Sequence, residues 1–388
     1  MKPAPWAAAL LLAVALIFLP MWANWRTVGD YEPHAEYVAR LLAHDESVWP
    51  ELPNFAWHVS VALPYGLFGG GVQDWIVVAN LAWVWLLALA LWWPMRMAWQ
   101  PTNWRAEAGL ILLVLALLIL APPSLLTPDN AYFGYLHPYV YHNPTMLPLR
   151  PLAWLTLLGT AKLCHAPKDW RRLALWAALA GLILAGIWAK PSFALAFLPA
   201  LLAFGLLRSA LRQPFDGLGA LLGLLLPAAA LLAWQSVSYS GAALGWRPLE
   251  VFNLWAYHYN PLANQQLALK ALLSLAFPLA VLLTDRRAVV RAPLMQLAWL
   301  TFLAAAGQTY LFNDLAHPVD GNLIWNGQIA VFALLMASAL HAAQRWHDWK
   351  VGPRGLVALA FSLHLMGGLW WYGLHLGADY EWLIDEAW

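Results

Sequence analysis

Long apolar runs dominate this chain of 388 residues and leave few folds open to it. A helix that crosses the hydrocarbon core of a bilayer needs about 20 mostly apolar residues. Eleven such runs occur along the sequence, at residues 6–24, 75–94, 107–122, 147–164, 173–189, 193–208, 217–236, 269–284, 293–312, 324–343 and 355–376. The expected fold is therefore an all-α polytopic membrane protein with about eleven transmembrane helices, which form a single domain over residues 1–388.

The composition excludes several classes of protein. Hydrophobic residues make up 62% of the chain and charged residues 11%, whereas a soluble domain carries roughly 25% charged residues. A water-soluble monomer could not bury this much apolar surface. The net charge of +1 provides no positive field for a nucleic acid. The single cysteine, Cys164, excludes an intramolecular disulfide and a cysteine-based metal cage.

The distribution of Lys and Arg between the loops predicts the orientation. With a cytoplasmic N-terminus, most of the 21 basic residues fall inside, and the six outside are Arg26, Arg40, Arg150, Lys190, Arg247 and Lys270. An odd number of spans then places the C-terminus outside. The first run ends in Leu19-Pro20-Met21-Trp22. Because that sequence lacks a small-residue cleavage site, we interpret the run as a retained helix and not as a signal peptide.

The outer loops carry most of the chemically useful side chains. Most of the acidic residues and histidines fall in or near the outer segments 25–74, 123–146, 237–268 and 313–323. The expected inner loops are short basic turns. Because the spans themselves are nearly free of charge, the pattern favours a site at the outer boundary between membrane and water over a mid-membrane transport pathway.

The first outer loop, residues 25–74, contains the most informative stretch. Pro33 suits the first turn of a helix, and Ala35, Val38, Leu41 and Leu42 then share one face. This spacing predicts an amphipathic helix along the membrane interface. A second interfacial helix is expected around residues 55–68, which include His58.

Asp30 and Glu32 stand at the start of the predicted interfacial helix. One carboxylate could take a proton from an acceptor hydroxyl as a general base. Together the two could hold a divalent metal such as Mg or Mn. The alternative is structural, because acidic residues at helix starts are favoured by capping and by the helix dipole.

The topology and this motif resemble the GT-C superfamily of polytopic glycosyltransferases. A short cytoplasmic start, one span and a long outer loop that opens with an acidic motif are common to both. The run from Gly29 to Leu42, with Asp30-Tyr31 followed by His34, is similar to that of many uncharacterised bacterial members. Glu32 stands where the commonest form of the motif has a second Asp.

The resemblance implies an activity and a location. It implies transfer of a sugar from a polyprenyl-phosphate donor to a glycan, lipid or protein acceptor, with inversion, at the extracytoplasmic face of the bacterial inner (plasma) membrane. Asp30, Glu32 and His34 would be the catalytic residues, and Asp30 and Glu32 the metal ligands if a metal takes part. Membrane lipid is the surrounding partner.

Further polar residues of the outer loops are candidates for substrate binding. His58, His142 and Asn143 can form hydrogen bonds with hydroxyl groups, and Arg150 can bind a phosphate. The same aromatic, polar stretch also suits an interface belt with an Arg side chain that reaches the surface.

Lys190 closes a tight hairpin between two spans and could face a buried anion, although Pro191 alone explains the turn. Arg247 with His258 forms a similar polar and aromatic cluster. Asn322, next to an Asp-Gly turn, could orient an acceptor sugar.

Two other functions remain open. One is a polymerase or ligase of the O-antigen type, although its large loop usually lies later in the chain. The other is a transporter or flippase of a lipid-linked sugar, which would show an internal repeat or charged residues within the spans. A structural membrane subunit is a third possibility. His-Glu-x-x-His, phosphate-loop and Gly-x-Ser-x-Gly motifs do not occur in the sequence.

Overall fold

Every element in the described part of the chain is a helix, which confirms the expected all-α class there. The structure is a computed structural model that describes residues 3–25, 30–123, 143–164, 169–239, 267–311 and 323–377. Its α-helices are α1 (Ala4–Trp25), α2 (Tyr31–Leu42), α3 (Ala56–Phe68), α4 (Val72–Trp99), α5 (Trp104–Ile119), α6 (Met146–Leu163), α7 (Trp170–Ala189), α8 (Ser192–Ala210), α9 (Gly217–Ala220), α10 (Leu226–Tyr239), α12 (Leu267–Thr284), α13 (Arg286–Val289), α14 (Pro293–Leu311), α15 (Ile324–Arg345) and α16 (Val351–Gly377). Shorter segments are the 3₁₀ helices η1 (Glu46–Glu51) and η4 (Trp346–Asp348) and the π-helix η3 (Leu221–Leu225).

Seven helices among the described residues are long and apolar enough to cross a membrane: α1, α4, α7, α8, the continuous α9–η3–α10 unit, α15 and α16. Each of the eleven predicted runs coincides with a helix. The remaining four, α5, α6, α12 and α14, are shorter or more polar. α5 ends at Ile119, shortly before Pro122, and α6 contains Arg150 and Lys162. The larger number of spans stays a prediction.

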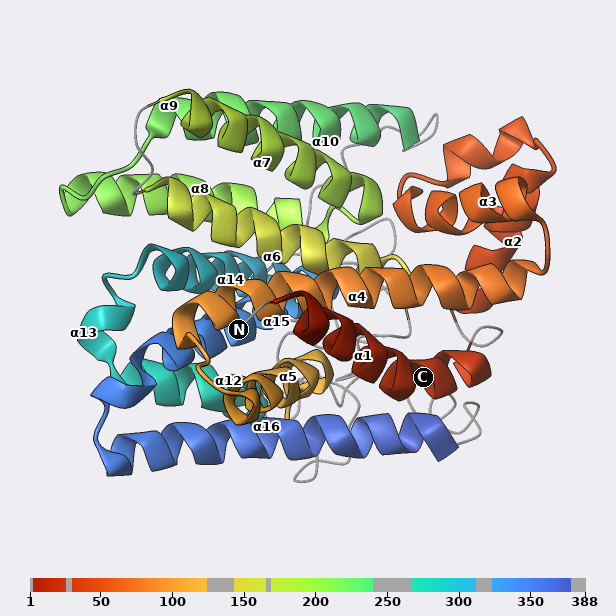
Figure 1. Ribbon diagram of the computed structural model, residues 1–388. Helices are drawn as coiled ribbons and strands as arrows, with labels where there is room; N and C mark the ends of the chain where they lie inside the picture. Colours follow the sequence, from red (N-terminus) through yellow and green to blue (C-terminus); the bar gives the residue numbers. More distant parts are fainter. Residues whose placement is uncertain are drawn as a thin grey trace.

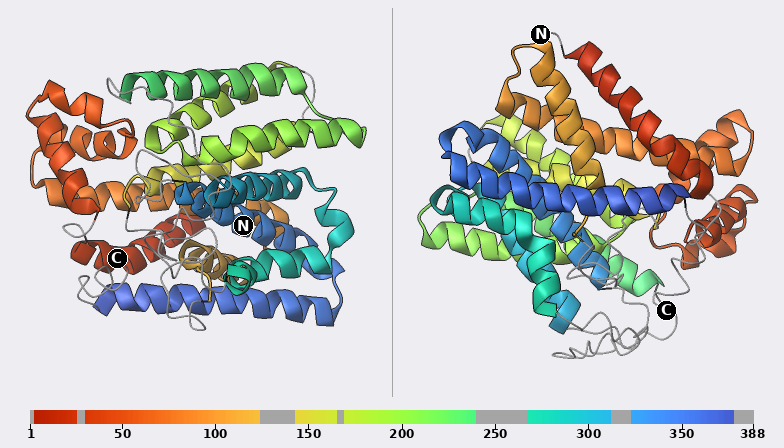
Figure 2. Two further views of the ribbon diagram at one scale, coloured as in Figure 1. Left: turned by 180° about the vertical axis from the view of Figure 1, so that it is seen from behind. Right: turned by 90° about the horizontal axis from the view of Figure 1, so that it is seen from below.

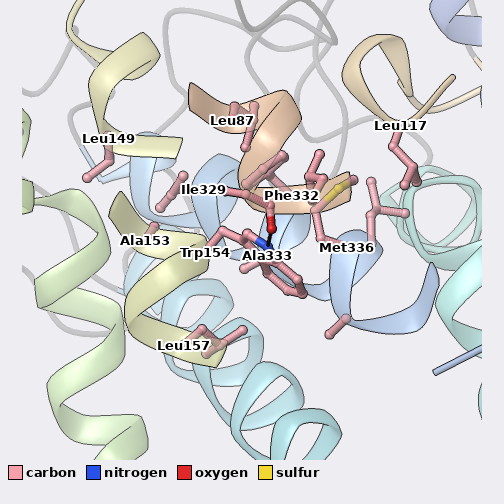
Figure 3. Close-up of a cluster of buried hydrophobic side chains, with 14 of the residues drawn as sticks. Leu87, Leu117, Leu149, Ala153, Trp154, Leu157, Ile329, Phe332, Ala333 and Met336 are labelled. Carbon is pink, nitrogen blue, oxygen red and sulfur yellow. Dashed lines mark hydrogen bonds between the residues drawn. The ribbon is translucent and has the colours of Figure 1, made fainter. Parts of the chain in front are cut away.

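Helix α15 is the centre of the bundle. It is buried from Ile324 to Ala342 and packs against α4, α6, α8, α12 and α14. Figure 3 shows Ile329 and Phe332 of α15 in one cluster with Leu149 and Trp154 of α6. In Figure 1 and in the left view of Figure 2, α10 and α16 lie at opposite edges of the bundle, with the other long helices between them.

The loops predicted to be cytoplasmic lie at one end of the bundle, and several of their charged side chains are paired. In Figure 1, α9 and α13 lie at one end, and the helices α2 and α3 lie at the other. The connections predicted to be cytoplasmic hold a set of close ion pairs: Arg96–Glu107 at 2.8 Å, Arg172–Asp216 at 2.7 Å and Arg345–Asp285 at 3.1 Å. Acids and bases that were predicted to share one side therefore meet there.

Candidate functional site

Asp30 directly precedes α2 and has helical backbone angles, φ −61° and ψ −17°. An acid at this position usually accepts a hydrogen bond from a backbone N–H of the first turn. Within the described residues the Asp30 carboxylate makes no such capping bond. It accepts a 3.0 Å hydrogen bond from the side-chain amide of Asn143. The carboxylate is thus oriented by a residue far along the chain.

Other acids at helix starts show what capping looks like in this protein. At the start of η1, Asp45 accepts a 2.9 Å hydrogen bond from the backbone N–H of Ser47. At the start of α9, Asp216 accepts one of 3.1 Å from the backbone N–H of Gly219. The capping interpretation fits these two acids and does not fit Asp30.

Asn143 is held so that its amide nitrogen is directed at Asp30. Its side-chain oxygen accepts hydrogen bonds from the backbone N–H of Thr145 at 3.1 Å and from the Thr145 hydroxyl at 2.5 Å. Because the oxygen is used in this way, the nitrogen is the atom left to donate to Asp30. Asn143 and Thr145 are both buried just before α6.

Lys190 brings a positive charge to the same region from the hairpin between α7 and α8. Its ammonium nitrogen lies 4.0 Å from the centroid of the Trp325 ring, a cation–π contact with α15. Burial lowers the pKa of Lys190 to about 7, and the nearby negative charge of Asp30 opposes that shift. Among the described residues no ion pair within 4.0 Å joins Lys190 to an acid, so the charges of Asp30 and Lys190 are neighbours without direct contact.

Two neutral histidines lie beside these charges. His34 stands one helical turn after Asp30 on α2, and its Nδ1 lies 2.8 Å from Nε2 of His58 on α3. Burial, then the charges of His58 and Lys190, lower the pKa of His34 to about 3. Burial lowers the pKa of His58 to about 4. Both imidazoles are therefore neutral near pH 7, where one can donate and the other accept.

A buried hydrogen-bond chain fixes α2 against the bundle. The indole of Trp57 on α3 donates to the Asn80 side-chain oxygen on α4 at 2.9 Å. The Asn80 amide donates to the Tyr31 hydroxyl on α2 at 3.2 Å. All three side chains are buried. Sequence reasoning missed Trp57 and Asn80, although a lone Asn within an otherwise apolar run was a usable signal.

The structure does not bring Glu32 to Asp30. Two residues along a helix correspond to a rotation of about 200°, and the Glu32 side chain is exposed. Among the described residues, no group of three or more His, Cys, Asp or Glu side chains is arranged to hold a metal ion. The predicted Mg or Mn site at Asp30 and Glu32 therefore lacks a fitting donor set in the described part of the chain.

Arg150 lies inside the bundle near the start of α6. Its side chain is 4% exposed, and its guanidinium carbon lies 4.8 Å from the centroid of the Phe332 ring on α15. This burial does not fit an arginine that reaches to the membrane surface. Both Arg150 and Lys190 therefore place their cationic groups against aromatic rings of the central helix.

The other predicted binding residues, His142, Arg247, His258 and Asn322, lie outside the described residues. The described part thus brings Asp30, His34, His58, Asn143 and Lys190 together at the end of the bundle that carries α2 and α3. An oriented carboxylate can accept a proton, and a partly desolvated ammonium can stabilise an anion. The arrangement suits a reaction in which Asp30 accepts a proton and Lys190 stabilises a leaving group that becomes negatively charged.

No protein-family model, curated protein or solved structure matches the chain.

Proposed function

We propose that the protein is a membrane glycosyltransferase that moves a sugar from a polyprenyl phosphate to an acceptor hydroxyl at the outer membrane face. The observation that carries the proposal is the position of Asp30. Its carboxylate is held by Asn143 and lies near Lys190, whose pKa falls to about 7. A carboxylate that accepts a proton and a cation that stabilises the leaving phosphate are the two groups that such a transfer needs.

The chemistry assigns one role to each group. The acceptor hydroxyl oxygen forms a bond to the anomeric carbon while the bond from that carbon to the phosphate oxygen breaks. Asp30 takes the hydroxyl proton, and the electron pair of the broken bond leaves with the polyprenyl phosphate. The Lys190 ammonium stabilises the negative charge on that phosphate, with Arg150 as a second cation deeper in the bundle. A single displacement inverts the anomeric configuration.

His34 and His58 support Asp30 as neutral groups. Because their pKa values of about 3 and about 4 keep them uncharged, they add no positive charge that would pair with the Asp30 carboxylate and weaken it as a base. The hydrogen bond between them joins α2 to α3 on the face that carries Asp30. Their proposed role is to position the carboxylate.

The proposal includes an arrangement of the helices in the membrane. The helices cross the bacterial plasma membrane in eleven spans, four of them shorter or more polar than the seven apolar ones. The basic connections lie in the cytoplasm, and α2 and α3 lie along the outer interface. The polyprenyl chain of the donor then lies among the lipids, with its phosphate at the depth of Lys190.

Purified protein in liposomes tests the function. The liposomes contain undecaprenyl phosphate that carries radiolabelled glucose, mannose or galactose, together with a short-chain lipid glycoside as acceptor. The proposal predicts a new glycosidic product with inverted anomeric configuration from at least one donor. A donor that only changes leaflets identifies a flippase, and extension of lipid-linked oligosaccharide by whole repeats identifies a polymerase; either outcome contradicts the proposal.

A further inference from the structure

One face of α15 presents a polar group between two aromatic rings. Trp325, Gln328 and Phe332 are spaced by three and four residues, so they lie within about 60° of one another around the helix. The Lys190 ammonium makes a cation–π contact with the Trp325 ring, and the Arg150 guanidinium makes one with the Phe332 ring. Gln328 is therefore on the face of the central helix toward which both cations are directed.

The side-chain amide of Gln328 has no hydrogen-bond partner at either end within the described structure. Gln328 is 1% exposed, and neither its amide nitrogen nor its amide oxygen is bonded. Gln296 on α14 shows the usual solution for a buried amide. Its nitrogen donates to the Val290 carbonyl at 2.8 Å, and its oxygen accepts from Arg208 at 3.2 Å. A buried amide with both ends unused is costly and indicates a missing partner.

The chemistry of the amide restricts what that partner can be. Its nitrogen needs an acceptor and its oxygen needs a donor. The phosphodiester of a lipid-linked sugar carries no O–H group, so its oxygens only accept and satisfy only the amide nitrogen. A pair of neighbouring sugar hydroxyls satisfies both ends, because a hydroxyl group both donates and accepts.

The position of Gln328 along α15 is consistent with contact to the sugar of a donor whose phosphate lies beside Lys190. Gln328 lies three residues beyond Trp325, a rise of about 4.5 Å into the bundle. A sugar whose phosphate lies beside Lys190, above Trp325, therefore has its hydroxyl groups within reach of this level.

We propose that Gln328 recognises a pair of hydroxyl groups of the transferred sugar and so helps to select the donor. This inference rests on the proposed function, since the donor is a sugar phosphate. Gln328 then distinguishes glycosylated lipid phosphate from bare lipid phosphate. Lys190 and Arg150 serve the phosphate, which both lipids share.

Binding measurements with Gln328→Met test the assignment. The probes are bare undecaprenyl phosphate and undecaprenyl phosphate that carries glucose, mannose or galactose, with the full-length protein in detergent. Methionine keeps the length of the side chain and removes both polar ends. We expect the variant to fold, to bind the bare lipid within about twofold of wild type, and to lose on the order of 10–100-fold in affinity for the preferred glycosylated lipid.

A matched variant serves as the control, and four outcomes would contradict the assignment or the proposed function. Gln296→Met removes a buried, bonded amide from the other end of the bundle and should leave the preference for sugar unchanged. The assignment is overturned if Gln328→Met keeps the full preference, as expected for an amide that only holds a water, or if wild type itself shows none. An equal loss for bare and glycosylated lipid assigns Gln328 to the phosphate instead. Failure of wild type to bind any of these lipids contradicts the proposed function itself.

Discussion

Lys190 has a pKa far below that of the free amino acid. In water its pKa would be near 10.5, and burial lowers it to about 7 despite the neighbouring Asp30. The protein therefore keeps a lysine that is only partly charged at neutral pH. Such a group is costly to the fold, but it becomes fully charged when a phosphate binds beside it.

Replacement of Lys190 by Arg should change the pH dependence of transfer. In wild type, the proposed kcat/KM for the donor should fall above pH 7, because the protein without donor loses the ammonium proton there. An arginine stays protonated at all accessible pH values, so Lys190→Arg should lack this alkaline decline. An identical decline in the variant would show that Lys190 is not the titrating group. The measurement is the initial rate at low donor concentration between about pH 6 and pH 9.

Replacement of Lys190 by Met should stabilise the unliganded protein at neutral pH. The native pKa of about 7 lies below the unfolded value of 10.5, so the unfolded chain binds more protons between these values. Wild-type stability should therefore rise with pH through that window, and the variant should lack the rise. Thermal unfolding in detergent at pH 7 and pH 10 measures both effects. A less stable variant at pH 7 would assign Lys190 a structural role.

At the scale of elements, α2 and α3 form the unit that presents Asp30 and His34. The Tyr31–Asn80–Trp57 chain and the His34–His58 pair join these helices to α4 and to each other. Neither contact involves charge at neutral pH, so the unit depends on its histidines remaining neutral. The stability of the α2–α3 unit should therefore decrease as the pH falls.

Lowering the pH should loosen the α2–α3 unit. The native pKa values of His34 and His58, about 3 and about 4, lie below the unfolded value of 6.5. The unfolded segment takes up protons first as pH falls below 6.5, so stability is complete above that pH and is lost below it, by up to about 1.4 kcal/mol per pH unit for each imidazole. Hydrogen exchange of α2 and α3 at pH 7 and pH 5 measures the loss. The double variant His34→Gln, His58→Gln should respond less, and an equal response would assign the effect to other groups.

Helix positions and several site residues could be predicted from the sequence, because apolar runs and turn residues act locally. Asp30, Asn143 and Lys190 were recognised by residue type and loop. That these three residues lie close together could not be predicted. Asp30 and Asn143 are 113 residues apart in the sequence, and their proximity depends on how α6 and α7 pack. Glu32 was grouped with Asp30 on spacing alone, but the helix turns its side chain to the surface. Gln328 gave no signal because its orphaned amide is visible only in three dimensions.

For the whole molecule, the orientation in the membrane can be tested with cysteine labelling. The protein has one cysteine, Cys164, which is buried, so the background is low. Glu46→Cys, in exposed η1, should react with a membrane-impermeant maleimide in intact bacteria. Arg105→Cys, at the exposed start of α5, should react only after permeabilisation. The reverse pattern would invert the topology and move the Asp30 site to the cytoplasm.

The most direct test of the central claim compares Asp30→Asn with Asp45→Asn in the liposome transfer assay, with donor affinity measured in parallel. Asp45 belongs to the same predicted outer segment but caps η1 and pairs with Arg40, so its variant should retain transfer. Asp30→Asn keeps the size of the side chain and removes its ability to take a proton. We predict that it binds the donor and that turnover falls on the order of 10²–10⁴-fold. Full turnover by Asp30→Asn would contradict the claim that this carboxylate takes part in forming the glycosidic bond.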